Sequence, residues 1–421
     1  MTGPAGRDRP AKVPRPWVSG PAGRDRPAKA PRPSPAGPSW DAIVVGLGAL
    51  GSAATWALAR AGARVLGLEQ FELGHHRGAS HDHARIIRRS YHTPGYVRLA
   101  GQAYRAWAEL EREAGARLVV TTGGLDLFPP AAAIPPGPYR ASLEACGVPY
   151  RWLEAAEVMR RWPAFRLEDG VHGLWQADAG MVPAARATRL MQRLAAGHGA
   201  TLLDQAPVTA VRDLSTAVEV DAAGTSFRAG RLLLCTDAWT GGLLAQLGAT
   251  LPLVVTQEQF SYFRPADPAA FAPGRFPVWI WMDDPSFYGF PVWPGAALKA
   301  AQDVGGREVT ATTRGFDPDP AASERLAGFL RALLPGAGAH DHTATCLYTL
   351  TPDRDLVLGP VGGHDRVLVA LGAAHGFKFA PLLGRVLADL TLEGGTEVDV
   401  APFDPGHPAL TTPGARASYL V

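Results

Sequence analysis

The stretch from Asp41 to Glu69, DAIVVGLGALGSAATWALARAGARVLGLE, constrains the fold more than any other part of this 421-residue sequence. A short apolar run leads into a glycine-rich turn, an alanine-rich helical pattern follows, and a second apolar run ends on Glu69. Gly46, Gly48 and Gly51 have the GxGxxG spacing, which permits a tight turn, close approach of a pyrophosphate and close helix–strand packing. The helix N-terminus would offer free N–H groups to the phosphates. The stretch therefore predicts a Rossmann-like fold that binds a dinucleotide.

The acid at the end of the second run narrows the choice of dinucleotide. The carboxylate of Glu69 is placed to accept both hydroxyls of an adenosine ribose, and it would repel the 2′-phosphate of NADP. The glycine motif itself does not separate NAD from FAD.

Apolar periodicity outlines the other elements. LVVTTGGLDLF predicts two strands about a turn, and RLLLCTDAWT predicts a buried strand. VPAARATRLMQRLAAGHGATLL predicts a helix that runs into a strand, and RVLVALGAAHGFKFAPLLGRVLADLTL predicts a strand, a glycine-rich turn and a last helix. The block from 253 to 300 alternates apolar and polar residues, as antiparallel sheets do. One further helix is predicted by apolar residues on a single face: Tyr96, Leu99, Ala103, Trp107 and Leu110.

Nucleotide-fold elements thus stand at the start, the middle and the end of the chain, with sheet-rich segments between them. A simple NAD dehydrogenase usually keeps its nucleotide domain more contiguous, so this interleaving favours a flavoprotein. We expect an α/β (α+β, two-domain) fold with a Rossmann-like, discontinuous FAD-binding domain and an inserted, mainly antiparallel-sheet substrate domain. The FAD-binding domain would comprise residues 40–122, 179–252 and 343–405, and the substrate-binding domain residues 123–178 and 253–342.

Both ends of the chain are expected to form tails. GPAGRDRPAKVPRP returns after a short spacer as GPAGRDRPAKAPRP, and this Pro- and Arg-rich repeat is nearly free of large apolar residues. Residues 1–39 are therefore expected to be disordered, and residues 406–421 to form a C-terminal tail. The repeat has no apolar core like that of a secretory signal, and no apolar run in the chain is long enough to span a bilayer.

Charge and cysteine content narrow the partners and the compartment. The net charge of +2 includes a tail with eight Lys or Arg against two Asp, so the rest of the chain is mildly acidic and gives no reason to expect nucleic acid binding. Cys146, Cys235 and Cys346 lie far apart, without metal-ligand or CxxC spacing. We therefore expect no metal and no disulfide framework, and a reducing, cytoplasmic location.

Five motifs, in order along the chain, resemble those of the monomeric sarcosine oxidase and N-methyltryptophan oxidase family of D-amino-acid-oxidase-like flavoproteins. They are GLGALG with Glu69, SHDHARIIR, YGFPVWPGAALK, CLYTLTPDRD and GAAHGFKF. The resemblance covers residues 40–405. It implies FAD as the cofactor, a small carboxylate-bearing amine as the substrate, O₂ or another electron acceptor, and a monomer.

In that family a cysteine at the position of Cys346 bonds through sulfur to the flavin 8α carbon, so the resemblance implies covalent FAD. The thiolate is the nucleophile, and a nearby cation or dipole should therefore lower the pKa of Cys346. The competing interpretation is a buried, inert cysteine, as most free cysteines are.

The resemblance also assigns the active site. Arg88 and Lys378 match the pair that binds the substrate carboxylate through charge-assisted hydrogen bonds. Arg85 matches an arginine beside the flavin ring, where it stabilises the anionic reduced flavin. His375 and Tyr348 are candidates for the same site, although a structural histidine and a packing tyrosine are the alternatives. Further cofactor contacts are implied at Ser80, Val208, Gly372 and Gly376.

Three positions depart from the family pattern. A lysine that promotes reaction with O₂ is expected between 264 and 275, where this chain reads RPADPAAFAPGR. A small residue near Ala269 takes its place, and Arg275 is a candidate for the missing cation. Ala84 replaces a small hydroxyl residue near the flavin, and Asp237 replaces a glycine near the cofactor, where its carboxylate would repel pyrophosphate unless it points away.

The sequence therefore predicts an FAD-dependent amine oxidoreductase. It would transfer hydride from a small secondary, N-methyl or cyclic amino acid to flavin N5, giving an imine and H₂O₂. Three alternatives stay open: a flavin dehydrogenase with a non-oxygen acceptor, an NAD-linked dehydrogenase, and a non-catalytic flavin-binding subunit.

Overall fold

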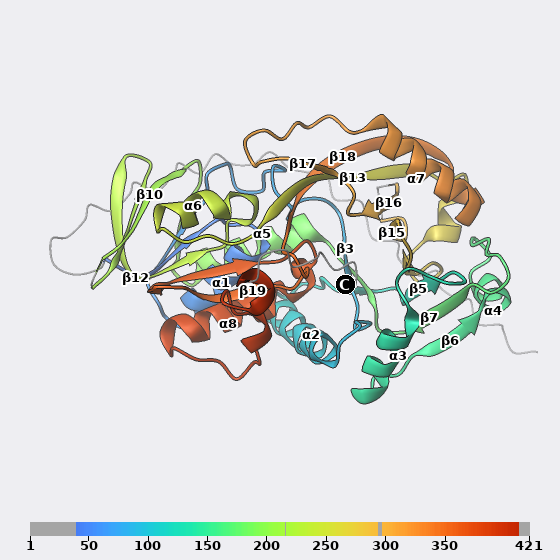
Figure 1. The fold of residues 1–421 in the computed structure, drawn as a ribbon, viewed down its shortest axis with the longest axis horizontal. Coiled ribbons are helices and arrows are strands. Elements are labelled where there is room, and N and C mark those ends of the chain that lie inside the picture. Colours follow the sequence, from blue (N-terminus) through green and yellow to red (C-terminus); the bar gives the residue numbers. More distant parts are fainter. Residues whose placement is uncertain (1–38, 215, 294–296, 412–421) are drawn as a thin grey trace, which may run out of the picture. The chain divides into compact units, whose positions relative to one another are not determined.

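The computed structural model describes residues 39–214, 216–293 and 297–411. Except for Ser39, the predicted N-terminal tail lies outside these residues, as do the last ten residues of the predicted C-terminal tail. The first part of that C-terminal tail includes a short helix, α9 (Pro408–Thr411). Within the described residues the strands form sheets of eight, nine and three strands, arranged as Figure 1 shows.

The GxGxxG stretch folds as predicted. Strand β1 (Trp40–Val45) leads through the glycine turn into helix α1 (Ala49–Arg60), and β2 (Val65–Leu68) returns parallel to β1. On its other side β1 pairs in parallel with β12 (Thr225–Leu234), which contains the predicted buried strand. The rest of the eight-stranded sheet consists of β9 (Thr201–Leu203), β10 (Val208–Asp213), β11 (Val218–Ala222), β19 (Val357–Val361) and β20 (His364–Leu371).

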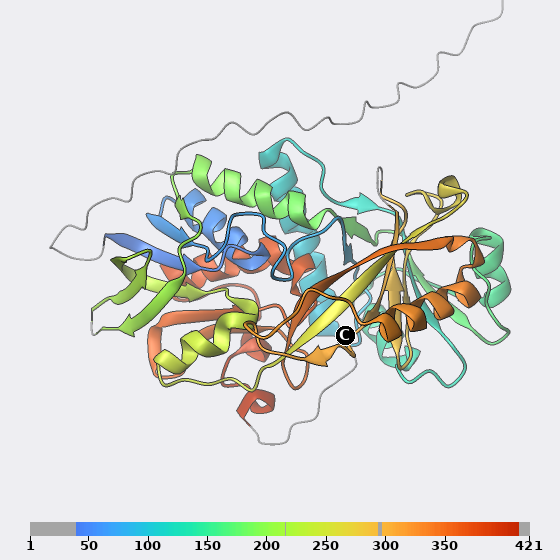
Figure 2. The ribbon, with the colours of Figure 1, turned by 90° about the horizontal axis from the view of Figure 1, so that it is seen from above.

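Three long helices pack around α1. Helices α5 (Ala184–Gly197) and α8 (Ala380–Leu392) both contact α1, and Figure 2 shows α5 beside it. Helix α2 (Pro94–Ala114) packs against α8, and its predicted apolar face is buried from Tyr96 to Leu110. The first and last segments of the eight-stranded part therefore share one core.

The nine-stranded sheet is mainly antiparallel, as the alternation between 253 and 300 predicts. Its longest ladder joins β13 (Val254–Arg264) to β18 (Ala339–Leu350), and one parallel pair, β14 (Val278–Trp281) with β5 (Gly124–Phe128), lies at its middle. The remaining strands are β6 (Arg151–Glu154), β7 (His172–Gln176), β15 (Ser286–Gly289), β16 (Leu298–Asp303) and β17 (Arg307–Glu308). The other helices of at least seven residues are α3 (Pro136–Ala145), α4 (Ala155–Arg161), α6 (Thr240–Gln246) and α7 (Pro320–Leu333).

The segment LVVTTGGLDLF forms two strands, but they do not pair with each other. Strand β4 (Val120–Thr121) joins a three-stranded sheet with β3 (Arg85–Ile87) and β8 (Gly180–Val182), whereas β5 enters the nine-stranded sheet. Gly123 between them has φ +74°, which turns the chain from one sheet to the next. Strand β3 carries Arg85 and is followed closely by Arg88, so this small sheet holds part of the site.

The eight strands of the first sheet all come from segments assigned to the FAD-binding domain. Strand β18 begins at Ala339 and pairs in the nine-stranded sheet, although the proposed boundary at 343 falls inside it. The division into two domains stays a prediction. No helix among the described residues combines the length and the apolarity needed to cross a membrane.

Candidate active site

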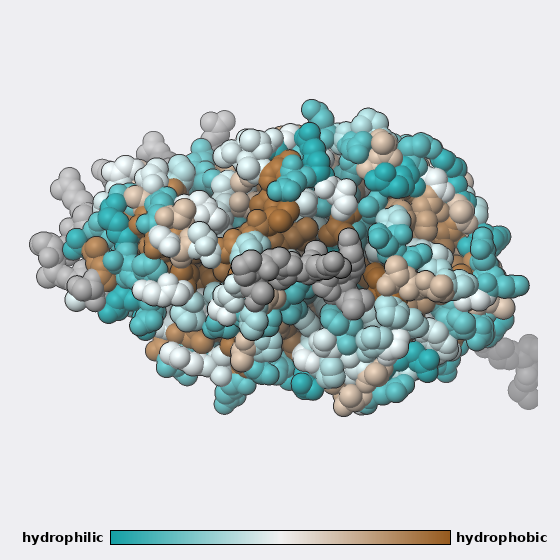
Figure 3. Space-filling view, in the orientation of Figure 1, coloured by the Kyte–Doolittle hydropathy of each residue, from teal (hydrophilic) through white to brown (hydrophobic). Residues whose placement is uncertain are grey.

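A cavity of about 470 Å³ runs along the glycine turn and reaches the segment around Lys378. Its wall is built from β1, α1, the 69–88 segment, α5, the end of β12, β15, β18 and the turn after β20. In the orientation of Figure 1, Figure 3 shows apolar surface gathered near the middle of the molecular face, between α6 and β13. The volume lies within the range of small-molecule and cofactor sites.

The glycine turn leaves no room for side chains. Gly46 has φ +87°, and a Cβ added there would lie 2.5 Å from the carbonyl oxygen of Cys235. A Cβ on Gly51 would lie 1.8 Å from the carbonyl oxygen of Gly46. Gly48, which precedes α1, lines the cavity, so backbone rather than side chain faces a ligand there. The tight turn at Gly46 and the close packing at Gly51 agree with the motif, and the contact of Gly48 with a pyrophosphate stays a prediction.

Glu69 is buried at the end of β2 and lines the cavity beside this turn. Its carboxylate accepts hydrogen bonds from the backbone N–H of Leu47 at 2.9 Å and of Phe71 at 3.2 Å. His75 Nε2 lies 3.4 Å from it. Ser80 also approaches the turn, and its hydroxyl accepts a hydrogen bond from the N–H of Ala49, in the first turn of α1, at 2.9 Å.

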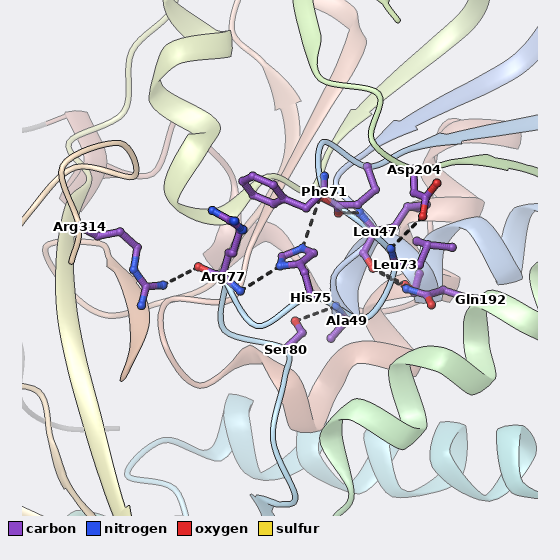
Figure 4. A network of polar contacts seen from close by, with 12 residues as sticks. Leu47, Ala49, Phe71, Leu73, His75, Arg77, Ser80, Gln192, Asp204 and Arg314 are labelled. Atoms are coloured by element: carbon purple, nitrogen blue, oxygen red, sulfur yellow. Dashed lines mark hydrogen bonds and ion pairs between the residues drawn. The ribbon is translucent and has the colours of Figure 1, made fainter. Parts of the chain in front are cut away.

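Residues 70–84, which we call the connecting segment, run along the cavity from Glu69 to Arg85. Figure 4 shows Arg314 donating to the carbonyl oxygen of Arg77, whose N–H in turn meets His75. A second nitrogen of Arg314 donates to the hydroxyl of Thr345 at 2.8 Å, one residue before Cys346. The connecting segment is therefore tied both to the dinucleotide turn and to strand β18.

A buried ionic cluster fixes the far end of the connecting segment. The carboxylate of Asp82 binds Lys299 Nζ on β16 and the hydroxyl of Tyr262 on β13, and Arg85 lies 3.6 Å from it. Burial lowers the pKa of Lys299 to about 8, although Asp82 opposes this effect. The guanidinium of Arg85 also donates to the carbonyl oxygens of Ala84 and Ala79, at 2.9 and 2.7 Å. Arg85 is thus held in one orientation at the cavity wall.

Arg88 is buried and has an acidic neighbour that the sequence did not reveal. Its Nη1 lies 3.1 Å from the hydroxyl of Ser90 and 3.4 Å from the carboxylate of Asp126 on β5. The Ser90 hydroxyl in turn donates to Asp126. Burial raises the pKa of the Asp126 carboxyl, while Arg88 and Ser90 oppose this shift. Arg88 is therefore a buried residue and does not take part in a surface ion pair.

Lys378 lies near Arg88. Both cations approach the ring of Tyr91, with the Cζ of Arg88 4.9 Å and the Nζ of Lys378 5.5 Å from its centroid. Lys378 Nζ donates to the carbonyl oxygen of His375 at 3.1 Å. Two alanines that precede His375, Ala373 and Ala374, have positive φ, so the turn GAAHGF is strained. Two segments that lie far apart in the sequence thus bring two basic side chains to one cavity.

The His375 ring is enclosed. Its Nε2 donates to the carbonyl oxygen of Arg354 at 2.9 Å, and its plane packs at 5.5 Å from Tyr96, between centroids. The guanidinium of Arg354 forms an ion pair with Asp303 at the end of β16, 3.0 Å between Nη1 and Oδ2. Burial lowers the pKa of His375 well below its ordinary value. The ring is therefore neutral and held by backbone, as in the structural alternative.

Cys346 lies beside the cavity and is not one of the residues that line it. It is buried on β18 among Phe260, Tyr262 and Ala301. Tyr348, two residues on, does line the cavity, and its hydroxyl lies 3.4 Å from that of Tyr288. Burial raises the pKa of the Cys346 thiol to about 11, although Arg85 and Lys299 lower it. The expected cations are present, but the expected net lowering of the pKa is wrong for this structure.

Most of the predicted residues line this one cavity: Gly46, Gly48, Glu69, Ser80, Arg85, Arg88, Val208, Tyr348, Gly372, His375, Gly376 and Lys378. Gly51 and Cys346 do not. Sequence reasoning missed Arg354, Asp303 and Asp126. The motif CLYTLTPDRD contains Arg354, and the position of this arginine within a family motif was the available signal. Nothing in the sequence singled out the two aspartates.

The structure also shows where the residues lie that depart from the family pattern. Asp237 does line the cavity, with φ +45°, and burial raises the pKa of its carboxyl to about 6. Ala84 is buried beside Arg85. Ala269 and Arg275 are exposed and do not line the cavity, so Arg275 is not placed to supply a cation there. The described residues hold no cluster of His, Cys, Asp and Glu that could bind a metal ion.

The residues present fit FAD. The glycine turn exposes backbone where Cβ atoms would fill the space, and an acid stands at the end of β2, as a dinucleotide requires. The cavity also extends past the turn to Arg85, which leaves room for the flavin half of FAD. Gly46, Gly48, Glu69 and Ser80 would hold the adenosine and pyrophosphate, with Arg85 further along the same wall.

Comparison with known proteins agrees with this fit. Residues 41–390 match the DAO family, described as FAD dependent oxidoreductase. A monomeric sarcosine oxidase from Streptomyces avermitilis is 34% identical over 376 residues, covering 87% of this chain and 97% of that protein. An N-methyl-L-tryptophan oxidase from Salmonella heidelberg is 31% identical over 370 residues, covering 86% and 98%.

A solved structure of another amino acid oxidase is also similar to this chain. NikD, an amino acid oxidase of nikkomycin biosynthesis, is 28% identical, with a TM-score of 0.79 and coverage of 88% of this chain and 98% of that one. The family match also resolves the choice between NAD and FAD that the glycine motif left open. The chain belongs to the DAO family of FAD dependent oxidoreductases, as its five motifs predict.

Proposed function

We propose that this FAD-dependent amine or amino-acid oxidoreductase oxidises the C–N bond of a small secondary, N-methyl or cyclic amino acid. The observation that carries the proposal is the pair Arg88 and Lys378, which both line the cavity and both face the ring of Tyr91. Two basic side chains that converge on a cavity suit one carboxylate once both carry a proton. The FAD, when bound, accepts a hydride at N5 and passes the electrons to O₂, so that the products are an imine and H₂O₂.

The protein supplies position and charge. Arg88 and Lys378 bind the substrate carboxylate, which fixes the carbon that loses hydride. Arg85, held by Asp82 and by two carbonyl oxygens, stabilises negative charge that develops on the cofactor. Tyr348 contributes a hydroxyl to the wall. Because the His375 ring is bound to the backbone of Arg354, we propose that its role is to place Lys378 through its carbonyl oxygen.

The proposal includes a covalent link between Cys346 and FAD. Cys346 shares a strand face with Tyr348, a cavity residue, and Arg85 and Lys299 lie close enough to lower the pKa of its thiol. Side chains two residues apart on a strand point to the same side, which supports placing Cys346 on the side of the cavity. We further propose the two-domain division of the sequence analysis, with residues 343–350, the rest of β18, moved to the substrate-binding part, and a cytoplasmic monomer.

One observation favours a second candidate, a flavin dehydrogenase that uses an acceptor other than O₂. The chain has no lysine between Lys29 and Lys299, and Arg275 is exposed. The described wall of the cavity therefore lacks the cation that the family resemblance places there.

One experiment tests both candidates. The purified holoenzyme is mixed without oxygen with N-methyl and cyclic amino acids, and flavin reduction is followed by the loss of its absorption near 450 nm, roughly where oxidised flavins absorb. Turnover is then compared under air, with H₂O₂ detection, and with an artificial acceptor. Reduction by an amino acid and fast H₂O₂ formation support the oxidase. Reduction with slow H₂O₂ formation favours the dehydrogenase, and a flavin that no amine reduces contradicts both.

A further inference from the structure

Lys378 differs from the other buried cations around the cavity. It is 8% exposed, its Nζ donates to one carbonyl oxygen, and it forms no ion pair with a carboxylate of the described residues. Two aromatic rings flank it, those of Tyr91 and Phe379. A lysine buried in this way keeps its proton only at a cost in free energy, because no carboxylate of the described residues pairs with its charge.

The neighbouring cations increase that cost. Arg88 is paired with Asp126, and Arg354 is paired with Asp303, at 3.4 and 3.0 Å. Both guanidiniums stay charged, because arginine does not lose its proton in proteins. The acids nearest to Lys378 are thus already engaged by other cations, and the site is close to neutral when Lys378 carries no proton.

We propose that Lys378 is the proton acceptor for the substrate ammonium. An aliphatic amine carries its proton at neutral pH, so the amino acid enters as a zwitterion with no net charge. Its proton passes to Nζ of Lys378, leaving a neutral amine, which is the form that loses hydride, and a lysine ammonium paired with the substrate carboxylate. One N–H bond breaks, one forms, and no proton is exchanged with solvent. The inference rests on the proposed function.

The groups around Nζ support the transfer in this direction. Burial lowers the pKa of Lys378 well below its ordinary value, Arg88 and Arg354 lower it further, and Asp303 raises it. His375 and Tyr91 are also titratable neighbours, and both are neutral near pH 7, because burial lowers the pKa of His375 and raises that of Tyr91. A substrate carboxylate would supply the missing counter-charge and so raise the proton affinity of Lys378 once bound. No carboxylate base is needed.

The first test measures protons directly. Methylthioacetate, a small carboxylate without nitrogen, is titrated into the holoenzyme by calorimetry in two buffers of different ionisation enthalpy near neutral pH. We expect one proton to be taken up for each carboxylate bound, because this ligand brings none for Lys378. Binding without proton uptake means that Lys378 is already charged, and it overturns the inference.

The second test uses Lys378→Arg, which keeps a cation and removes the acceptor. We expect this variant to bind methylthioacetate without proton uptake. Its limiting rate of flavin reduction should rise about tenfold per pH unit up to the pKa of the amine, while that of the wild type stays flat around neutral pH. A flat profile in the variant contradicts the proposal. If the variant does not fold, the proton measurement on the wild type still decides.

The outcomes separate this inference from the proposed function. Proton uptake with methylthioacetate, together with a flavin that no amine reduces, would contradict the proposed reaction and leave the neutral state of Lys378 standing. Flavin reduction by an amino acid, together with no proton uptake on methylthioacetate binding, would support the proposed reaction and contradict the neutral state of Lys378.

Discussion

Arg88 shows how a single residue balances stability against binding. It is buried, and its charge is compensated by Asp126 on another strand, with Ser90 bonded to both. A buried ion pair adds little net stability, but the loss of one partner is costly because it leaves the other charge alone. A substrate carboxylate near Arg88 would compensate the charge of its guanidinium, as Asp126 does.

Asp126→Asn should therefore lower the free energy of unfolding by about 3 kcal/mol without ligand. A saturating carboxylate such as methylthioacetate should then raise the Tm of the variant more than that of the wild type, because the ligand replaces the lost anion. Thermal unfolding with and without ligand measures both effects. Asp178→Asn removes the partner of Arg89 at the surface and serves as the control, with little change in either value. Equal ligand effects in wild type and Asp126→Asn would contradict the argument.

Cys346→Ser should keep a yellow protein whose flavin enters the supernatant after acid precipitation, whereas the colour of the wild type should stay with the pellet. The reason is that a hydroxyl cannot form the thioether that we propose. Absorption spectra of pellet and supernatant provide the measurement. Cys146→Ser, at a half-buried cysteine that does not line the cavity, should behave as the wild type. Flavin in the wild-type supernatant would contradict the covalent link.

At the scale of elements, α1 and α8 approach each other where Gly384 faces Ala53. A Cβ on Gly384 would lie 2.4 Å from the carbonyl carbon of Ala53, which is backbone and cannot move aside. Helix α1 begins at the dinucleotide turn and α8 follows the turn with Lys378, so this contact sets the distance between the two parts of the site.

Gly384→Ala should destabilise the protein by about 1–3 kcal/mol, because the added methyl group must separate the two helices. It should also lower the fraction of the protein that acquires FAD. Gly101→Ala is a matched control, since Gly101 lies within helix α2 and a Cβ there meets nothing within 4 Å. Alanine has the higher helix propensity, so this change should stabilise by up to about 1 kcal/mol. Urea unfolding of both variants tests the pair, and a neutral Gly384→Ala would show that the helices adapt.

Elements also show what the sequence could and could not reveal. The β1–α1–β2 unit was predictable because its glycines, apolar runs and acid are all local. Asp126 was not, because β5 alternates as GLDLF and a polar residue at its centre is typical of a solvent-facing side chain. Its carboxylate meets Arg88, which directly follows strand β3 of a different sheet. Arg354 was not predicted for a related reason. It lies in a turn, with φ +61°, and a turn residue is expected to be exposed, but its guanidinium is buried against β16.

At the scale of the whole molecule, the Asp82 cluster joins the connecting segment to the nine-stranded sheet. Asp82 binds Lys299 on β16 and Tyr262 on β13. Burial raises the pKa of Asp82, but Lys299 and Arg85 lower it more, so it ends well below its ordinary value. A carboxylate with a lowered folded-state pKa stabilises the fold above its unfolded pKa of about 3.9, and this stabilisation is lost as the pH falls.

Asp82→Asn should lower stability at neutral pH, since it leaves Lys299 buried without its anion, at a cost of about 3–5 kcal/mol. Below pH 4, roughly the unfolded pKa of the carboxyl, the variant should lose stability less steeply than the wild type. Urea unfolding across a pH series measures the two slopes. Parallel slopes would mean that Asp82 does not titrate with unfolding.

The packing of α8 against α1 has a consequence for the order in which the protein matures. Of the described residues, those of the dinucleotide turn are among the first to leave the ribosome. The wall of their cavity nevertheless includes Tyr348, His375 and Lys378, and one face of α1 is uncovered until α8 is made. A nascent chain that ends before these residues has a cradle open on one side. Cofactor capture therefore comes after synthesis of nearly the whole described chain, and a yellow colour reports that α1 and α8 have packed together.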